Sequence, residues 1–417
     1  MPKTTITAVR AREILDSRGN PTLDVTVTCE GGGNTCLPAG RFAVPSGAST
    51  GTHEALELRD GDQSRFGGQG ALRAATNVNV NLAGALVGMD ARDQRAIDAR
   101  MIAMDGTPSK SVLGGNALIG ISIACARAAA SALNTPLHEY LHALAPGITP
   151  SRSVPFLNMN LINGGKHAAT RVAFQEYKLI PQTDDVAEAL QIGTRVMHAL
   201  KARITSEYGA VHANVGDEGG FAPDLISVRR PLELLMETAS DLHIDHRIKL
   251  AIDVAASSFY DPVTDRYTYD DAPHTADELA ADLRAIMRDF PMLYIEDPFH
   301  EDAFEDFARL NDNSCMIVGD DLTVTNTSRL AHAVETKAIG GVIIKPNQVG
   351  TLTETLDAMQ LAREHDIACI VSHRSGETND DFIADLAVAF GVFGIKAGGP
   401  QRGERIAKYN RLLELSS

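Results

Sequence analysis

Six short apolar runs decide the fold class: IKLAIDVAA (248–256), MLYIEDP (292–298), CMIVGDD (315–321), GVIIKPN (341–347), IACIVSHRS (367–375) and FGIKAGG (393–399). Each run is rich in Val, Ile or Leu, and a segment with helical periodicity separates most of them. Strands that alternate with helices are typical of parallel strands joined by crossover helices. The second part of the chain is therefore predicted to be an α/β domain.

A polar residue ends each of these runs at a regular spacing. The six residues are separated by 43, 24, 25, 28 and 23 positions, and the first gap leaves room for an inserted hairpin. They are Asp253, Glu296, Asp320, Lys345, His373 and Lys396. In a (β/α)8 barrel, strand ends meet at the mouth that carries the active site. An open doubly wound sheet binds its ligand at one switch point and would not use six strand ends, so a TIM-type barrel is favoured.

The first part of the chain has a different pattern. The runs TITAVRAREI, TLDVTVTCEG and NTCLPAGRFAV are β-rich and separated by turns, which predicts an antiparallel meander. Helical spacing follows at 77–88, 91–104 and 116–133. We therefore expect a small α+β domain over residues 1–140, with a mobile loop at 41–54, and the barrel over 141–417.

Composition narrows the class of protein. The chain has 417 residues, with 38 Lys and Arg against 54 Asp and Glu, a formal charge of −16. No basic block is present, which argues against a nucleic-acid or anionic-membrane partner. Five scattered cysteines without a C-x-x-C pair suggest neither a disulfide framework nor a thiolate zinc site. The charged N-terminus lacks a signal-peptide pattern and the longest apolar runs are short, so a cytoplasmic location is expected.

The acidic strand ends predict a metal site. One acid after a strand is usually a helix cap or a loop residue, but Asp253, Glu296 and Asp320 would converge and repel one another. A hard divalent cation with oxygen ligands resolves that repulsion, and magnesium suits such ligands. Asp297 and Asp321 follow two of these acids and could support the site from behind.

The basic strand ends predict a base. A lone Lys after a strand usually extends to solvent, but Lys345 and Lys396 flank His373, Arg374 and Ser375. A lysine that accepts a proton must have its pKa lowered from about 10.4 towards 7 to 8, and nearby cations do this. We therefore expect Lys345 to be neutral.

Three glycine-rich segments complete the pattern: GRFAVPSGASTGTHEA (40–55), INGGKHAATRVAFQEY (162–177) and NVGDEGGFAP (214–223). Each could be a simple surface loop. The third could instead hold Glu218 rigidly over a cavity, where a raised pKa would make it a general acid.

These motifs resemble the enolase family along almost the whole chain. The resemblance runs through AREILDSRGNPTLDV, VPSGASTG, INGGKHA, GDEGGFAP, IEDPFHE, GDDLTVTN, IKPNQVGTLTET, SHRSGET and GERIAKYNRLL. It implies a modified (β/α)8 barrel after a small α+β domain. It also implies a lyase that dehydrates 2-phosphoglycerate reversibly to phosphoenolpyruvate in glycolysis, with two Mg²⁺ per site, the second arriving with substrate. A homodimer or an assembly of dimers is implied as well.

The resemblance also implies roles for single residues. Asp253, Glu296 and Asp320 would bind the first Mg²⁺, and Ser49 the second. Lys345 would remove the C2 proton, and Glu218, assisted by Glu176, would protonate the departing C3 hydroxide. The substrate would be bound by His167, Gln175, Arg374, Ser375, Lys396, His373 and Ala48.

The chain departs from the family pattern at a few positions. Ala169 and Thr170 stand where an Asn is usual, Tyr177 replaces Phe, Lys178 replaces an apolar residue, and 397–401 reads AGGPQ. Because several of these lie close in sequence to His167 and Glu176, they are expected to alter the substrate's surroundings. A paralogue acting on a phosphonate, such as carboxyphosphonoenolpyruvate synthase, is the alternative, and a non-catalytic binding or structural role is a third.

Overall fold

The computed structural model describes residues 3–30, 38–47, 51–312 and 314–416. Its N-terminal part opens with the predicted meander, an antiparallel sheet in the order β1-β2-β3. These strands are β1 (Ile6–Leu15), β2 (Pro21–Cys29) and β3 (Ala39–Ala43). At the first turn, the Asp16 carboxylate accepts the N–H groups of Arg18 and Asn20 at 2.8 and 2.9 Å. Residues 41–43 belong to β3, so the segment 41–54 is not a loop from its first residue.

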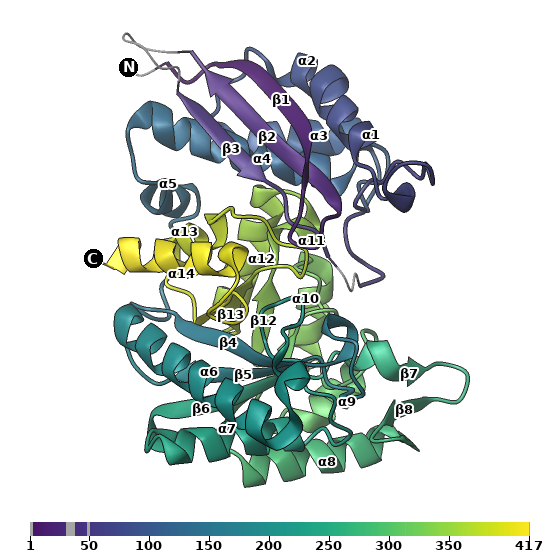
Figure 1. Ribbon diagram of the computed structural model, residues 1–417. Coiled ribbons are helices and arrows are strands. Elements are labelled where there is room, and N and C mark those ends of the chain that lie inside the picture. The colour runs from purple at the N-terminus through teal and green to yellow at the C-terminus, as the bar shows by residue number, and fades with distance from the viewer. Residues whose placement is uncertain (1–2, 31–37, 48–50, 313, 417) are drawn as a thin grey trace.

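Helices cover one face of this sheet (Figure 1). They are α1 (Leu72–Thr76), a π-helical turn (Asn77–Leu82), α2 (Ala83–Leu86), α3 (Gln94–Asp105), α4 (Gly115–Leu133) and α5 (Leu137–Leu144). The first three form one helical run, which begins before the predicted residue 77. Helix α4 approaches the sheet closely, since a Cβ on Gly40 would lie 2.0 Å from the carbonyl oxygen of Ala124. The predicted meander and helices are thus confirmed.

Helix α4 is longer than the apolar run seen in the sequence. With 19 residues and a mean hydropathy of 1.5, it could cross a membrane by length and composition alone. However, 78% of its apolar window is buried inside the structure, as in the core helix of a globular domain.

The rest of the chain forms a closed barrel in the order β10-β11-β12-β13-β14-β4-β5-β6. The strands are β4 (Phe156–Asn163), β5 (Glu176–Pro181), β6 (Ile248–Asp253), β10 (Met292–Glu296), β11 (Met316–Gly319), β12 (Gly341–Ile344), β13 (Ala368–Ser372) and β14 (Gly394–Lys396). The six predicted runs are β6 and β10 to β14, and each is parallel to its neighbour among them. The predicted barrel is confirmed.

One strand runs against the others. β5 is antiparallel to both β4 and β6. Residues 164–175 join β4 to β5 without a helix long enough to carry the chain back, and so short a connection gives an antiparallel pair. Consequently the beginning of β5, at Glu176, lies at the same mouth as the ends of the other strands, beside Asp253.

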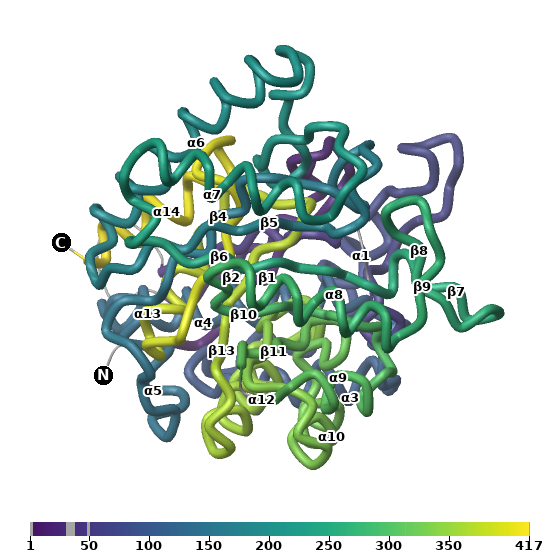
Figure 2. Tube along the Cα trace, turned by 90° about the horizontal axis from the view of Figure 1, so that it is seen from below, coloured from purple at the N-terminus to yellow at the C-terminus, as the bar shows by residue number. Residues whose placement is uncertain are grey.

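Helices surround the barrel, as Figures 1 and 2 show. They are α6 (Val186–Tyr208), α7 (Arg230–Asp241), α8 (Ala276–Asp289), α9 (Phe304–Leu310), α10 (Thr327–Glu335), α11 (Pro346–Val349), α12 (Leu352–Glu364), α13 (Phe382–Ala389) and α14 (Gly403–Ser416). Helix α8 begins with a capping box between Thr275 and Glu278, which satisfies its free N–H groups. The gap after Asp253 holds a three-stranded insertion, larger than the expected hairpin and projecting from the barrel in both views. Its strands are β7 (Tyr260–Asp261), β8 (Arg266–Tyr269) and β9 (Ala272–His274).

The barrel interior holds an apolar layer directly beneath the mouth. Ile180, Ala251, Tyr294, Val318, Ile343 and Ile370 form one buried cluster. Four of these stand two positions before Asp253, Glu296, Asp320 and Lys345. Because strand side chains alternate between faces, residues two apart point the same way. The polar side chains therefore continue the inward-facing rows above an apolar floor.

The N-terminal part reaches over the mouth. Ser46 and Gly376 form an isolated β-bridge, and the buried Glu54 carboxylate pairs with Arg374 at 2.9 Å. Further away, Arg127 on α4 pairs with Asp380 at 2.7 Å. The site is thus assembled between the two parts of the chain.

Candidate active site

The predicted residues converge on one small cavity at the barrel mouth. It is lined by His167, Gln175, Glu176, Glu218, Asp253, Lys345, Ser372, His373, Arg374, Ser375 and Lys396. Except for Ser372, the sequence pointed to all of them. Glu296 and Asp320 are not in the lining but contact lysines that are. Ala48 and Ser49 lie outside the described residues.

The backbone is unusual just after the acidic strand ends. Ala255, Asp297, Val324 and Thr325 have positive φ values between 42 and 56°, a region that side chains with a Cβ rarely adopt. Such strain is typical of functional sites, where the surrounding structure holds an unfavourable conformation.

The carboxylates form two groups that differ from the predicted trio. Asp253 and Glu296 lie with Glu176, with ligand atoms within 4.8 Å of one another, whereas Asp320 lies with Asp297 and Asp321. Glu176 joins the first group because the reversed β5 pairs it with Asp253. Asp297 stands behind Asp320, since its carboxylate accepts the N–H groups of Asp320 and Asp321 at 2.9 and 2.7 Å.

The first carboxylate group fits a divalent cation. Asp253 Oδ1 is buried and accepts no hydrogen bond from the part of the chain that the structure describes. A buried carboxylate oxygen without a donor is costly unless a cation lies nearby. Oxygen ligands of this kind favour a hard ion. The structure therefore supports a metal-binding region here, as the acidic strand ends predicted.

Two buried lysines already lie among these carboxylates. Lys396 Nζ is 2.7 Å from Glu296, 3.1 Å from Glu176 and 3.2 Å from Asp253. Lys178 pairs with Glu296 and lies 3.3 Å from Glu176. Burial opposes the charge on each lysine, but the carboxylates raise both pKa values above the usual range. In the sequence, Lys178 stood out only as a departure from the family pattern; its signal was a charged residue in a buried strand.

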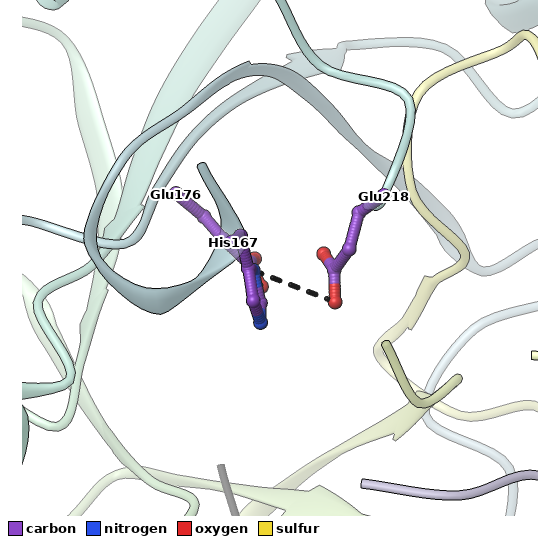
Figure 3. A group of neighbouring side chains, drawn as sticks. All are labelled: His167, Glu176 and Glu218. Atoms are coloured by element: carbon purple, nitrogen blue, oxygen red, sulfur yellow. Dashed lines mark ion pairs between the residues drawn. The ribbon is translucent and has the colours of Figure 1, made fainter. Parts of the chain in front are cut away.

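His167, Glu176 and Glu218 point toward one another, as Figure 3 shows. His167 Nδ1 lies 3.5 Å from Glu176 and 3.6 Å from Glu218. Burial, together with the charge of Glu218, raises the pKa of Glu176. Burial also opposes the charge on Glu218, but His167 and His373 lower the pKa of Glu218. The proton of this carboxyl pair is therefore favoured on Glu176, whereas the glycine-rich segment around Glu218 predicted the raised pKa at Glu218.

Arg405 fixes the tautomer of a second histidine, His373. The fully buried Arg405 lies 2.6 Å from His373 Nδ1, and a guanidinium can only donate. Nδ1 must therefore accept, which leaves the proton of a neutral His373 on Nε2, facing Glu218 at 3.2 Å. Burial lowers the pKa of His373 to about 3, which favours this neutral form. Arg405 was missed because it lies in a helix, not at a strand end.

Lys345 differs from the expectation in its charge. Its ammonium group pairs with Asp320, and Asp320 also accepts a hydrogen bond from Gln348 at 2.9 Å. Burial would lower the pKa of Lys345, but Asp320 raises it above the usual range, despite Arg374 and Lys396. The carboxylate in contact outweighs the more distant cations, so the lysine is charged in this arrangement.

Arg374 and Ser375 lie in the loop that follows β13 and present hydrogen-bond donors to the cavity. Arg374 is held by Glu54 and by Asn347, whose amide oxygen lies 2.9 Å away. Ser375 Oγ lies 3.3 Å from His167 Nε2. A guanidinium group that is held by two partners is suited to bind an anionic group such as a phosphate. Glu54 and Asn347 were missed, since only their partner stands at a strand end.

Two of the departures from the family pattern, Tyr177 and Gln401, do not line the cavity. Tyr177 points to the opposite side of β5, where its hydroxyl donates to the Val228 carbonyl at 2.9 Å. The expectation that it alters the substrate's surroundings is wrong, because adjacent strand residues face opposite sides. Gln401 donates to the Gly219 carbonyl at 2.5 Å, so it holds the loop that carries Glu218.

A larger cavity, of about 550 Å³, lies elsewhere, between β1, β3, α4 and the loop 377–381. Its charged residues are paired: Arg127 pairs with Asp380 and Asp381 inside the lining, and Arg41 and Glu377 pair with Asp24 and Lys408 outside it. The smaller cavity carries the concentration of buried ionisable groups that marks an active site.

Comparison with known proteins agrees with the geometry. Residues 6–141 match the family described as the enolase N-terminal domain, and residues 151–417 match the enolase C-terminal TIM barrel domain. The chain is 46% identical to Enolase B of Dictyostelium discoideum, over 98% of this chain and 94% of that protein. It is 46% identical to the enolase of Methanopyrus kandleri (100% and 96%) and 47% identical to that of Methanocaldococcus jannaschii (97% and 93%). Two domain matches in the family's order and this identity along nearly the full length establish that the chain belongs to the enolase family.

Proposed function

We propose that this protein dehydrates 2-phosphoglycerate reversibly to phosphoenolpyruvate, as a lyase of glycolysis. One observation carries the proposal: Lys345 and the Glu176–Glu218 pair line the same small cavity, together with Arg374. Removal of water across a carbon–carbon bond needs a base for the C2 proton and an acid for the C3 hydroxide. Both kinds of group are present beside a donor suited to the substrate's phosphate.

Asp253, Glu296 and Asp320 would hold a Mg²⁺, and Ser49 would contribute to a second. When bound, the divalent cations would take up negative charge from these carboxylates and from the substrate carboxylate as the C2 proton leaves. The contact between Asp320 and Lys345 bears on the base, because any weakening of that ion pair lowers the pKa of Lys345.

The other groups act on the substrate directly. Lys396, which contacts three carboxylates, would add positive charge near the developing dianion. His167, Gln175, Ser375 and His373 would orient the substrate, as would Ala48. The proton held between Glu176 and Glu218 would pass to the departing hydroxide, and His373 would keep the Glu218 carboxyl in place.

The proposal also includes a domain boundary near residue 140, a homodimer or assembly of dimers, and a cytoplasmic location. Light scattering on the purified chain would measure its assembly state.

The test is the formation of phosphoenolpyruvate from 2-phosphoglycerate, followed by its absorbance with Mg²⁺ present. Robust turnover that disappears on chelation supports the proposal. Turnover of a phosphonate analogue alone would favour the paralogue, and no turnover of either would favour a non-catalytic role. Since Tyr177 faces away from the cavity, the sequence support for the paralogue is weaker than expected.

A further inference from the structure

Lys178 occupies the boundary between the acidic mouth and the apolar floor of the barrel. It lies on β5 between Glu176 and Ile180, and its side chain is 0% exposed. Nζ pairs with Glu296 Oε2, lies 3.3 Å from Glu176 Oε2 and 5.1 Å from the centre of the Tyr294 ring. Burying an ammonium group in such a place is unfavourable unless carboxylates compensate for it. Lys178 is therefore held by Glu296, one of the proposed Mg²⁺ ligands, and by Glu176 beside it.

Lys178 changes the charge of that site. Glu176, Asp253 and Glu296 bring three carboxylates, and Lys396 contacts all of them. With Lys178 the group holds two ammonium ions instead of one, so its net charge is one unit less negative. Both Glu296 oxygens are engaged, Oε1 by Lys396 and Oε2 by Lys178.

We propose that Lys178 is a resident cation of the carboxylate group, a positioning residue that holds Glu296 and Glu176 and weakens the binding of a divalent cation. A bound ion experiences repulsion from the buried ammonium group and must share Glu296 with it. In return, the carboxylates are held in place without the metal. This inference rests on the proposed metal site.

The experiment uses the full chain, stripped of metal by chelation, with Mn²⁺ alone as the probe and its affinity measured by electron paramagnetic resonance. Lys178→Met should bind Mn²⁺ at least tenfold more tightly than the wild type. Lys249→Met is the matched control, because Lys249 lies on the adjacent strand β6, opposite Ile180. The Mn²⁺ affinity of this variant should stay within twofold of the wild-type value. Lys178→Arg keeps the charge and should not bind more tightly.

Equal or weaker Mn²⁺ binding by a folded Lys178→Met chain overturns the proposal, as does tighter binding by Lys178→Arg. Because loss of the lysine leaves Glu296 with a free oxygen, Lys178→Gln, which retains a donor, is measured in parallel. If both neutral variants unfold without metal, added Mg²⁺ must restore their circular dichroism, and failure to do so also overturns the proposal.

The proposed metal site has a separate control. Asp253→Asn should weaken Mn²⁺ binding in the wild-type background. If neither the wild type nor Lys178→Met binds Mn²⁺, the metal site itself and the inference both fail. If the wild type binds and Asp253→Asn does not, while Lys178→Met is unchanged, the inference alone fails.

Discussion

Two neighbouring layers of the same barrel have opposite chemistry. Asp253, Glu296 and Lys345 stand at the mouth, and Ala251, Tyr294 and Ile343 stand two residues earlier on the same strands, facing the same interior. The upper layer is charged, whereas the lower layer is an apolar cluster whose Tyr294 hydroxyl has no hydrogen-bond partner among the described residues. Strand geometry places both layers, and the side chains alone give one a chemical role and the other a structural role. Changes in the upper layer should alter activity, and changes in the lower layer should alter stability.

Lys345→Ala should give the largest effect in the upper layer. Exchange of the substrate's C2 proton should fall by about 10²–10⁴-fold, the usual contribution of a positioned base. The variant should remain folded and bind Mn²⁺ no more weakly than the wild type, because Lys345 pairs with Asp320 as a cation and is not a metal ligand. Deuterium exchange at C2, followed by nuclear magnetic resonance, measures this effect, with Lys201→Ala, at an exposed position of α6, as the control. Wild-type exchange in the variant would remove Lys345 from the mechanism.

Glu218→Gln should separate the two steps of the reaction. Dehydration should fall by about 10²–10⁴-fold because the acid is lost, while C2 exchange continues, because the base can return the proton to the carbanion. Phosphoenolpyruvate formation and C2 exchange are measured on one sample, with exposed Glu335→Gln as the control. Loss of both activities in a folded variant would contradict this division between base and acid.

The pH dependence of the free energy of unfolding should also report on the buried ionisable groups of the upper layer. The pKa of His373 is about 3 in the folded chain, against about 6.5 when unfolded, so the unfolded chain binds the extra proton first as pH falls. This histidine should therefore lower the free energy of unfolding by up to about 1.4 kcal/mol per pH unit between about pH 6.5 and 3. Above pH 6.5 it should contribute no slope.

Urea unfolding of the wild type and of His373→Gln at several pH values measures that slope. The variant should show a smaller loss of stability in this window. Equal slopes in the two proteins would mean that His373 is not buried as a neutral group.

Ile343→Ala tests the lower layer. Removing part of this fully buried side chain should destabilise the protein by about 2–5 kcal/mol through lost packing and a residual cavity. The value of kcat/KM should remain within about threefold of the wild type at a temperature where both are folded. Val263→Ala, at a residue 91% exposed, should change neither property. A large loss of activity without a loss of stability would break the distinction between the layers.

Tyr177→Phe should have the smallest effect. It removes the hydrogen bond to the Val228 carbonyl on the outer side of β5, worth about 1 kcal/mol of stability. Because the side chain faces away from the cavity, the ratio of kcat/KM for 2-phosphoglycerate to that for a phosphonate analogue should not move. Tyr260→Phe, whose hydroxyl contacts Asp265 at an exposed position, is the control for loss of a tyrosine hydroxyl. A tenfold change in the ratio would restore a role in specificity.

Polar residues at the ends of successive strands account for what the sequence could predict about the site. Asp253, Glu296, Asp320 and Lys345 each follow an apolar strand, and parallel strands bring their ends to one mouth. Glu176 is an exception, since it begins a strand instead of ending one. Only its motif, not its position in a repeat, could point to it.

Side-chain partners explain the errors. Lys345 was expected to be neutral because nearby cations such as Arg374 and Lys396 would disfavour its charge, but Asp320 contacts it directly and raises its pKa. Tyr177 was placed with Glu176 because the two are adjacent, although adjacent strand residues face opposite sides. Contact and facing depend on strand pairing, which spacing along the chain does not specify.

The sequence by itself determined the barrel, the meander and the set of polar groups at the mouth, because hydrophobic periodicity and the regular spacing of strand ends are local properties. The tertiary structure decided how those groups combine. Reversal of β5 brings Glu176 and Lys178 to Asp253 and Glu296, and burial then makes each charge depend on the one in contact with it. Electrostatic energy in a buried site depends on distances of a few ångströms between residues far apart in the chain, and only the folded arrangement sets those distances.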